Sequence, residues 1–251
     1  MRDGLRLALT TFTVLPLPPG RVDRATARLA MVLAPAVGAL LGLVLAVVAL
    51  GLSALGAPGL VLGGVAVGLG AALTRGLHLD GLADTVDGLG SYTARPRALA
   101  IMRSPEVGPF GVVAIVLAVL IQAGAIAGIA TRPALAVLAG LVTGLATGRL
   151  AVTWACRRGM AAARPDGLGA LVAGTTQTLE LALGLVAGAL VAVPAVPDRP
   201  WQGPLAVLVG LGASVVVHRH AVSRLGGITG DVLGALVEIA QTVTLVGLSF
   251  G

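Results

Sequence analysis

Residues 29–50 read LAMVLAPAVGALLGLVLAVVAL and contain no charged side chain. As an α-helix, a stretch of 22 residues would be about 33 Å long, because each residue adds 1.5 Å. That length is sufficient to cross the roughly 30 Å hydrocarbon core of a bilayer. The stretch therefore predicts a membrane-spanning helix and sets the fold class expected for the rest of the chain.

The composition extends this prediction to the whole sequence. Hydrophobic residues make up 57%, charged residues 11%, and the mean hydropathy of +0.99 excludes an ordinary soluble domain. Abundant Gly and Ala favour helices that pack closely through small residues. Because Cys156 is the single cysteine, no intrachain disulfide is expected. We predict an all-α, polytopic membrane bundle that forms one domain over residues 1–251. Its seven expected spans are 29–50, 58–74, 110–130, 133–155, 176–196, 201–218 and 232–250, of which 58–74 is the shortest.

The arginines predict how this bundle is oriented. All seventeen basic residues are Arg; fourteen fall in alternate connections, two in the others, and Arg149 lies within a span. The positive-inside rule then places the N-terminus in the cytoplasm and the C-terminus outside. The apolar run 7–17 is too short to span, so residues 1–28 are expected to form an interfacial segment. Residues 75–109 are expected to form a cytoplasmic segment with helical loops.

That cytoplasmic segment begins with the most unusual stretch of the chain, TRGLHLDGLADTVDGLG over residues 74–90. Asp80, Asp84 and Asp87 are spaced i, i+4 and i+7, which places them on one stripe of a helix. Like charges this close repel, so a bound cation would explain the stripe, and carboxylates suit Mg²⁺, Mn²⁺ or Ca²⁺. The alternative is a solvated acidic face. Four glycines favour a site, since they permit close approach of a ligand: Gly76, Gly81, Gly88 and Gly90.

Two other cytoplasmic loops carry candidate phosphate-binding groups. GGITGD at 226–231 could present backbone N–H groups to an anion, or could be a turn with an N-cap, and Asp231 could complete the cation site. Arg157, Arg158 and Arg164 precede Gly167-Leu168-Gly169. These arginines could bind phosphate, or could be topology signals alone.

Several titratable residues lie in or beside apolar segments. Arg149, Glu180 and Glu238 are expected to face the bundle interior and find partners, because each is costly in lipid. His78 could act as a general base, or its ring could be held by the backbone. His218 and His220 fall on different faces of a helix, which argues against a metal pair.

Taken together, these motifs resemble the cobalamin synthase family, that is, adenosylcobinamide-GDP ribazoletransferases. The resemblance covers nearly the whole chain. It is carried by HLDGLADTVDG at 78–88, MRSPEVGPFG at 102–111, GLG at 167–169 and GGITGD at 226–231, with LPLP at 15–18 and PAVG at 35–38. Leu77 and the stretch 104–106 depart from the family pattern, and the second departure puts a substrate role for Ser104 or Glu106 in doubt.

The resemblance implies a Mg²⁺-dependent enzyme of a bacterial inner membrane. It would join adenosylcobinamide-GDP to α-ribazole, or to its 5′-phosphate, and release GMP. No nucleic-acid partner is implied, and a homo-oligomer is left open. The implied metal ligands are Asp80, Asp84, Asp87 and Asp231. The implied catalytic residues are Asp84, His78 and Asp80. The implied substrate- and phosphate-binding residues are Arg75, Arg103, Arg157, Arg158, Arg164, Gly167, Gly169, Gly226, Gly227 and Thr229.

Two other functions fit parts of the pattern. A membrane phosphotransferase acting on CDP-alcohols also uses clustered aspartates, but Asp84 and Asp87 follow Asp80 too closely for that pattern. A secondary transporter would place its charges near the midplane and tend to show internal repeats, and no repeat is visible here.

Overall fold

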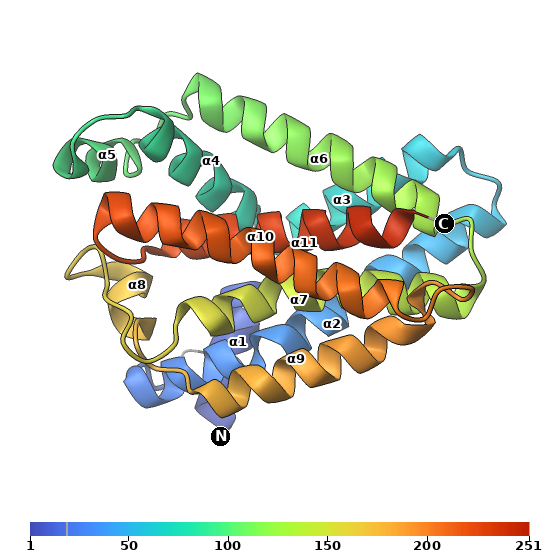
Figure 1. The fold of residues 1–251 in the computed structure, drawn as a ribbon, viewed down its shortest axis with the longest axis horizontal. Helices are drawn as coiled ribbons and strands as arrows, with labels where there is room; N and C mark the ends of the chain where they lie inside the picture. Colours follow the sequence, from blue (N-terminus) through green and yellow to red (C-terminus); the bar gives the residue numbers. More distant parts are fainter. Residues whose placement is uncertain (19, 251) are drawn as a thin grey trace.

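The computed structural model describes residues 1–18 and 20–250, and within these ranges every regular element is a helix. This confirms the all-α prediction. The elements are α1 (Arg2–Phe12), α2 (Arg24–Ala54), α3 (Gly59–Leu73), α4 (Leu77–Gly90), α5 (Arg95–Ile101), α6 (Pro109–Ile129), α7 (Ala134–Ala155), α8 (Gly167–Val172), α9 (Thr178–Ala192), the 3₁₀ turn η1 (Val193–Ala195), α10 (Gln202–Leu225) and α11 (Gly230–Ser249) (Figure 1).

Six helices are long and apolar enough to cross a membrane: α2, α6, α7, α9 with η1, α10 and α11. The remaining expected span, 58–74, behaves differently. It becomes α3, which is followed by α4 at an angle of 90°, so that the two helices form one broken pass or a re-entrant loop. The break lies at Arg75 and Gly76, which both have positive φ angles, 56° and 65°. The acidic stretch therefore follows the break as a helix of its own rather than extending the span.

Helix α10 is about two turns longer than the expected span 201–218, because it continues to Leu225. The helix ends where Gly226 adopts a left-handed conformation with φ of 75°, which is a common C-terminal stop. The extra residues carry α10 to the same end of the bundle as α5 and α8 (Figure 1).

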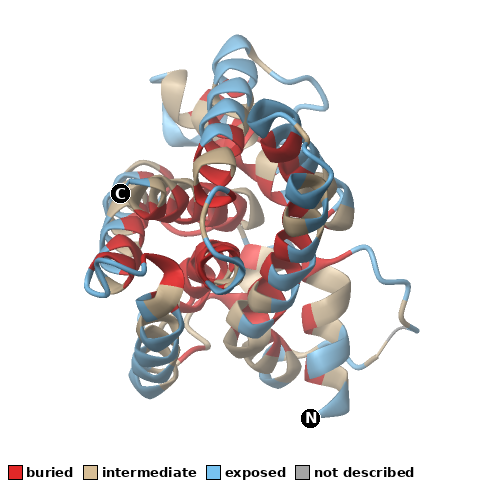
Figure 2. Ribbon diagram, turned by 90° about the vertical axis from the view of Figure 1, so that its right-hand side faces the viewer, coloured by how far each residue is buried: buried red, intermediate tan, exposed pale blue. Residues whose placement is uncertain are grey.

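Glycines hold the central helices together, as the Gly- and Ala-rich composition predicts. A Cβ at Gly38 or Gly42 of α2 would lie 2.5 Å from a backbone oxygen of α7, and one at Gly148 of α7 would lie 2.8 Å from the Val237 oxygen of α11. Such close backbone approaches substitute for the hydrophobic effect inside lipid. Figure 2 looks along the length of the bundle and shows buried residues on the inward sides of the helices, with exposed residues outside.

The charged residues inside the spans have partners. Arg149 and Glu238 are 3% and 7% exposed. Arg149 Nη1 donates to Gln241 Oε1 at 2.6 Å, and Glu238 Oε2 accepts from Gln122 Nε2 at 2.7 Å. This confirms the expectation that both face the interior. Glu180 instead lies at the start of α9, where it pairs with Arg28 at 2.5 Å.

The segments with polar chemistry gather at one end of the bundle. Arg103 pairs with Asp166 at 2.6 Å, and Ala162 bridges to Ile228, so the segments that follow α5, α7 and α10 meet there. At the other end, Arg132 donates to the backbone oxygens of Ala195 and Leu248. The two ends are thus chemically distinct, as expected from the arginine distribution.

Candidate active site

A crossing of two glycines brings α4 against the start of α11. A Cβ at Gly81 would lie 2.7 Å from the Asp231 oxygen and 3.1 Å from the Gly234 Cα. A Cβ at Gly234 would lie 3.2 Å from the Gly81 Cα. No larger residue fits at either position without separating the helices. This contact places Asp80 and Asp84, on either side of Gly81 in sequence, beside Asp231.

The resulting acidic group is short of positive charge. Asp84 is half-buried, and it is close enough to Asp80, Asp87 and Asp231 for their charges to repel its own. Among the ion pairs of the described residues, one reaches this group, from Arg164 Nη1 to Asp231 Oδ2 at 3.5 Å. Clustered carboxylates with so little compensation favour a bound cation.

Asp87 differs from the other three aspartates. Its oxygens accept hydrogen bonds from the backbone nitrogens of Gly108 and Gly111, at 2.8 and 2.9 Å. These groups belong to the first turn of α6, so Asp87 caps that helix from a distance of more than twenty residues in sequence. A Cβ at either glycine would collide with the Asp87 carboxylate.

The four aspartates therefore do not converge as the sequence was expected to place them. Within the described ranges, no three His, Cys, Asp or Glu side chains are close enough together to hold a metal ion as they stand. The physical reason at Asp87 is the competing cap on α6. Asp80, Asp84, Asp87 and Asp231 remain predicted ligands, but each oxygen of Asp87 already accepts a backbone hydrogen bond that holds this carboxylate against α6.

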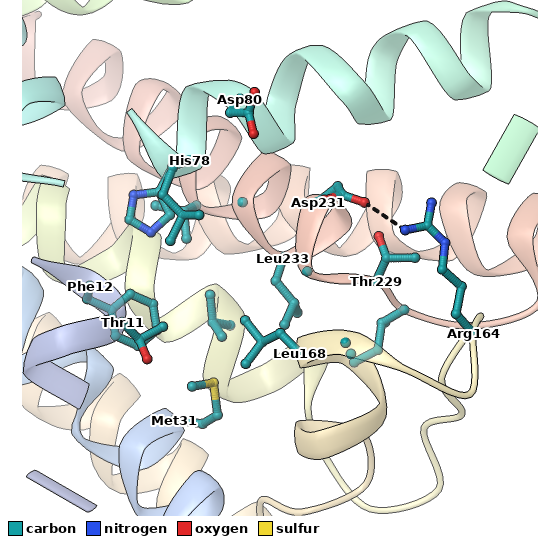
Figure 3. Close-up of a pocket in the computed structure, with 18 of the residues that line it drawn as sticks. Thr11, Phe12, Met31, His78, Asp80, Arg164, Leu168, Thr229, Asp231 and Leu233 are labelled. Atoms are coloured by element: carbon teal, nitrogen blue, oxygen red, sulfur yellow. Dashed lines mark hydrogen bonds and ion pairs between the residues drawn. The ribbon is translucent and has the colours of Figure 1, made fainter. Parts of the chain in front are cut away.

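A cavity of about 270 Å³ opens beside this group (Figure 3). It lies between α4, the start of α11, the segment around α8 and the end of α1. The predicted site residues that line it are His78, Asp80, Arg103, Arg164, Gly167, Gly169, Thr229 and Asp231. The sequence did not single out Thr11, Phe12, Met31 or Leu168, which form its less polar side. The end of α1 reaches the cavity through long-range packing, for which the sequence carries no local signal.

Both arginines in the cavity are held by acidic residues. Arg164 contacts Asp231 and also donates to the Leu99 oxygen at 2.8 Å, while Arg103 pairs with Asp166 at 2.6 Å. Arg164 is largely buried, with 15% of its side chain exposed, and Arg103 is 55% exposed. Guanidinium groups at these positions can neutralise phosphate in the cavity.

Three other predicted arginines lie outside the cavity lining. Arg75 donates to the Thr10 oxygen at 2.9 Å and so ties the break between α3 and α4 to α1. Arg157 stacks over the Trp154 ring at 3.9 Å. Arg158 donates its backbone N–H to the Thr176 oxygen at 3.0 Å. None of these three lines the cavity, so their substrate roles stay predictions without support from its geometry.

The GGITGD loop contains the turn and the N-cap that one of its two interpretations predicts. Gly226 ends α10, and a Cβ at Gly227 would lie 2.5 to 2.6 Å from the backbone of Ala161 and Ala162. Thr229 caps α11 by accepting from the Val232 nitrogen at 3.1 Å. The two glycines therefore position Thr229 and Asp231 rather than line the cavity themselves.

His78 lies at the deep side of the cavity and is 3% exposed. Its ring stacks on Phe12 with centroids 5.9 Å apart, and its Nδ1 lies 3.5 Å from Arg149 Nη2. The partner is thus a buried arginine and not the backbone group offered as the alternative to catalysis. His218 lies apart from this site, edge-on to Trp154 at 4.6 Å.

Comparison with known proteins agrees with the motifs. The family model described as cobalamin-5-phosphate synthase matches residues 4–249. A protein of Frankia casuarinae named adenosylcobinamide-GDP ribazoletransferase is 44% identical, covering 96% of this chain and 92% of the relative. A protein of the same name from Nocardioides sp. is also 44% identical, with 98% and 97% covered, and one from Corynebacterium efficiens is 32% identical, with 98% and 90% covered. No solved structure matches the chain. Matched over nearly its full length, the chain belongs to the cobalamin-5-phosphate synthase family of membrane enzymes.

Proposed function

We propose that this chain joins adenosylcobinamide-GDP to α-ribazole, or to its 5′-phosphate, and releases GMP, with Mg²⁺ as the cofactor. The family membership and the names of the relatives support the overall reaction. The observation that carries the residue assignment is the cavity in which Asp80 and Asp231 from two helices meet Arg103 and Arg164. Carboxylates and guanidinium groups around one cavity suit a diphosphate that must be both bound and cleaved.

The reaction exchanges a phosphoanhydride bond for a phosphate ester bond. A ribose hydroxyl of the acceptor attacks the phosphorus on the cobinamide side of the diphosphate. A new P–O bond forms, the P–O bond to GMP breaks, and the hydroxyl proton passes to a base on the protein. Such a transfer needs little covalent chemistry from the protein, so positioning and charge neutralisation dominate.

The residues present fit a divalent cation. The fit is one of ligand chemistry, since Asp80, Asp84 and Asp231 supply oxygen atoms of the kind that Mg²⁺ prefers but do not converge on one point as they stand. Among the described residues, one ion pair at 3.5 Å, from Arg164 to Asp231, reaches them. When bound, Mg²⁺ would neutralise charge on the diphosphate and on the leaving GMP. Arg164 and Arg103 would offset the remaining phosphate charge, and the glycines of α8 would let a bulky substrate approach the backbone.

The test is GMP release by the purified protein in detergent or proteoliposomes. Asp84→Asn keeps the size of the side chain but removes its charge, so we expect turnover to fall by about 100-fold or more, the range for losing one strong electrostatic contribution. The matched control is Asp198→Asn, an exposed aspartate after η1, at the other end of the bundle from the acidic group. Wild-type turnover in folded Asp84→Asn would refute the carboxylate assignment.

Removing the metal tests the cofactor separately. We expect a chelator to abolish GMP release and added Mg²⁺ to restore it. A rate that is unchanged in chelator would remove Mg²⁺ from the proposal without affecting the reaction itself. Assaying α-ribazole and its 5′-phosphate side by side identifies the preferred acceptor through kcat/KM.

A further inference from the structure

A chain of buried polar side chains runs from the middle of the bundle to His78. Gln122 Nε2 donates to Glu238 Oε2 at 2.7 Å, Gln241 Nε2 donates to Gln122 Oε1 at 3.0 Å, and Arg149 Nη1 donates to Gln241 Oε1 at 2.6 Å. Each of the five residues, His78 included, is 8% exposed or less. Because Arg149 can only donate and an ionised Glu238 can only accept, the two amides between them have one consistent orientation.

The second terminal nitrogen of Arg149 determines which ring nitrogen of His78 carries the hydrogen. Arg149 Nη2 lies 3.5 Å from His78 Nδ1. A guanidinium group has no acceptor, so this contact requires a lone pair on Nδ1, and the ring hydrogen must then be on Nε2. A ring with hydrogens on both nitrogens would place two cations against each other in a buried position. The geometry thus selects one tautomer of His78.

The selected tautomer leaves one donor without a partner. Among the described residues, His78 Nε2 is buried and makes no hydrogen bond. The plane of the ring is held by stacking on Phe12 at an interplanar angle of 18°. His78 lines the same cavity as Asp80, Asp231 and Arg164, and Figure 3 shows its imidazole and the Arg164 guanidinium on opposite sides of Asp231 in that view. A buried N–H without a partner is costly unless a ligand supplies the acceptor.

We propose that His78 binds substrate as a hydrogen-bond donor through Nε2–H, and that Arg149 is a positioning residue that holds this tautomer. The inference rests on the proposed function and refines it. The acceptor is an oxygen atom of the nucleotide substrate or of the attacking ribose. His78 then cannot take up the hydroxyl proton without losing its contact with Arg149. The proton that leaves when the new P–O bond forms passes to a base on the protein other than His78, while GMP departs with the electrons of the P–O bond that breaks.

Two conservative variants distinguish a hydrogen-bond donor role of His78 from a general-base role. His78→Gln places an amide nitrogen near the position of Nε2, whereas His78→Asn places one near Nδ1, and neither can act as a base at neutral pH. We expect His78→Gln to keep kcat/KM for GMP release within about ten-fold of wild type, and His78→Asn to lose about 100-fold. Equal losses in both folded variants would overturn the donor role. Higher activity in His78→Asn than in His78→Gln would also overturn it.

A double-mutant cycle tests Arg149. Arg149→Lys keeps a positive charge near Glu238, but its single ammonium cannot hold both Gln241 and His78 as the guanidinium fork does. If Arg149 acts through His78, Arg149→Lys lowers kcat/KM by about ten-fold or more in the wild-type background and by less than about two-fold in His78→Asn. Effects that simply multiply would refute the positioning role.

The control for the cycle is Thr147→Val on the same helix. Thr147 is 2% exposed, and its hydroxyl donates within α7 to the Thr143 oxygen. The change therefore removes a buried hydrogen bond that is not part of the series of polar side chains from Glu238 to His78. Monodisperse elution and an unchanged unfolding temperature identify the variants that can be compared. If the wild-type protein releases no GMP, the proposed function fails. Titration of adenosylcobinamide-GDP without acceptor then still ranks the His78 variants by binding, and equal binding by all of them would overturn the donor role.

Discussion

At the scale of single residues, the acidic stripe divides into two roles that its spacing does not distinguish. Asp84 lies among other carboxylates, whereas Asp87 accepts two backbone hydrogen bonds from the start of α6. Both residues are on the same face of the same helix, one turn apart. The difference comes from what packs against each turn, which is α11 at one and the glycine turn before α6 at the other.

This division predicts opposite outcomes for the same chemical change. We expect Asp87→Asn to destabilise the protein by about 1.5–3 kcal/mol, because it weakens two charge-assisted hydrogen bonds. Asp84→Asn should leave stability unchanged or raise it, because it relieves repulsion among carboxylates. Thermal unfolding of the detergent-solubilised variants measures both changes. If Asp87→Asn unfolds like wild type but requires much more Mg²⁺ for turnover, Asp87 is a ligand after all.

The site residues that the sequence could identify are those with a local signal. Asp80 and Asp231 stand out because charge is sparse in the chain, and Arg164 because it precedes a glycine turn. Phe12 could not be identified, because nothing in the neighbouring sequence distinguishes one apolar residue of an apolar segment from the others. Its place against His78 depends on how α1 packs on α2, where Gly4 lies against Leu29.

At the scale of secondary-structure elements, the site depends on one crossing. Helices α4 and α11 approach at Gly81 and Gly234 so closely that backbone faces backbone. Short polar side chains on the two helices thereby reach a common cavity from positions about 150 residues apart in the sequence. The glycine crossing is thus a requirement of the site as well as a packing feature.

Gly81→Ala is therefore expected to damage both stability and activity. Its Cβ would meet the Asp231 oxygen at 2.7 Å, so the helices must separate, at a cost of about 1–3 kcal/mol as in other overpacked interiors. Turnover should fall with it, because Asp231 moves relative to Asp80. The matched control is Gly64→Ala in α3, where a Cβ meets nothing within 4 Å. There the gain in helix propensity, up to about 1 kcal/mol, predicts equal or higher stability. Equal unfolding temperatures and turnover for both variants would contradict a role for the crossing.

Element prediction succeeded where hydropathy alone decides and failed where the backbone breaks. Six of the seven expected spans have a helix that is long enough to cross a membrane. The seventh, 58–74, forms α3 (Gly59–Leu73) close to the expected bounds, but at 15 residues α3 is too short to count as a span alone. It could cross only together with α4, and a 90° bend at Arg75 and Gly76 separates the two helices. Gly76 permits such a turn, but the presence of a glycine does not predict one, because many glycines of this chain lie inside helices.

At the scale of the whole molecule, the residues of the candidate site lie at one end of the bundle, beyond the middle of the membrane-spanning helices. Figure 1 shows α5 and α8 at one end of the bundle and the short turns after α6 and α9 at the other. The cavity opens at the first end. The sequence predicted this segregation through its alternating arginines, since each second connection returns to the same side. It could not predict the shape of the cavity, which needs contributions from at least four separate segments.

The arginine pattern further predicts that this end faces the cytoplasm, where a nucleotide-linked substrate would be made. Cysteine labelling can test the prediction, because the native Cys156 is fully buried and burial raises the pKa of its thiol, which keeps the reactive thiolate scarce. Ser104 and Ser53 are exposed residues near opposite ends of the bundle, after α5 and in the last turn of α2. In spheroplasts treated with a membrane-impermeant maleimide, we expect Ser53→Cys to be labelled directly and Ser104→Cys only after the membrane is opened. The reverse pattern would place the cavity outside the cell, and nucleotide chemistry there would require a separate supply of substrate. Equal labelling of both sites before lysis would mean that the protein inserts in both orientations, and the arginine distribution would then not determine its topology.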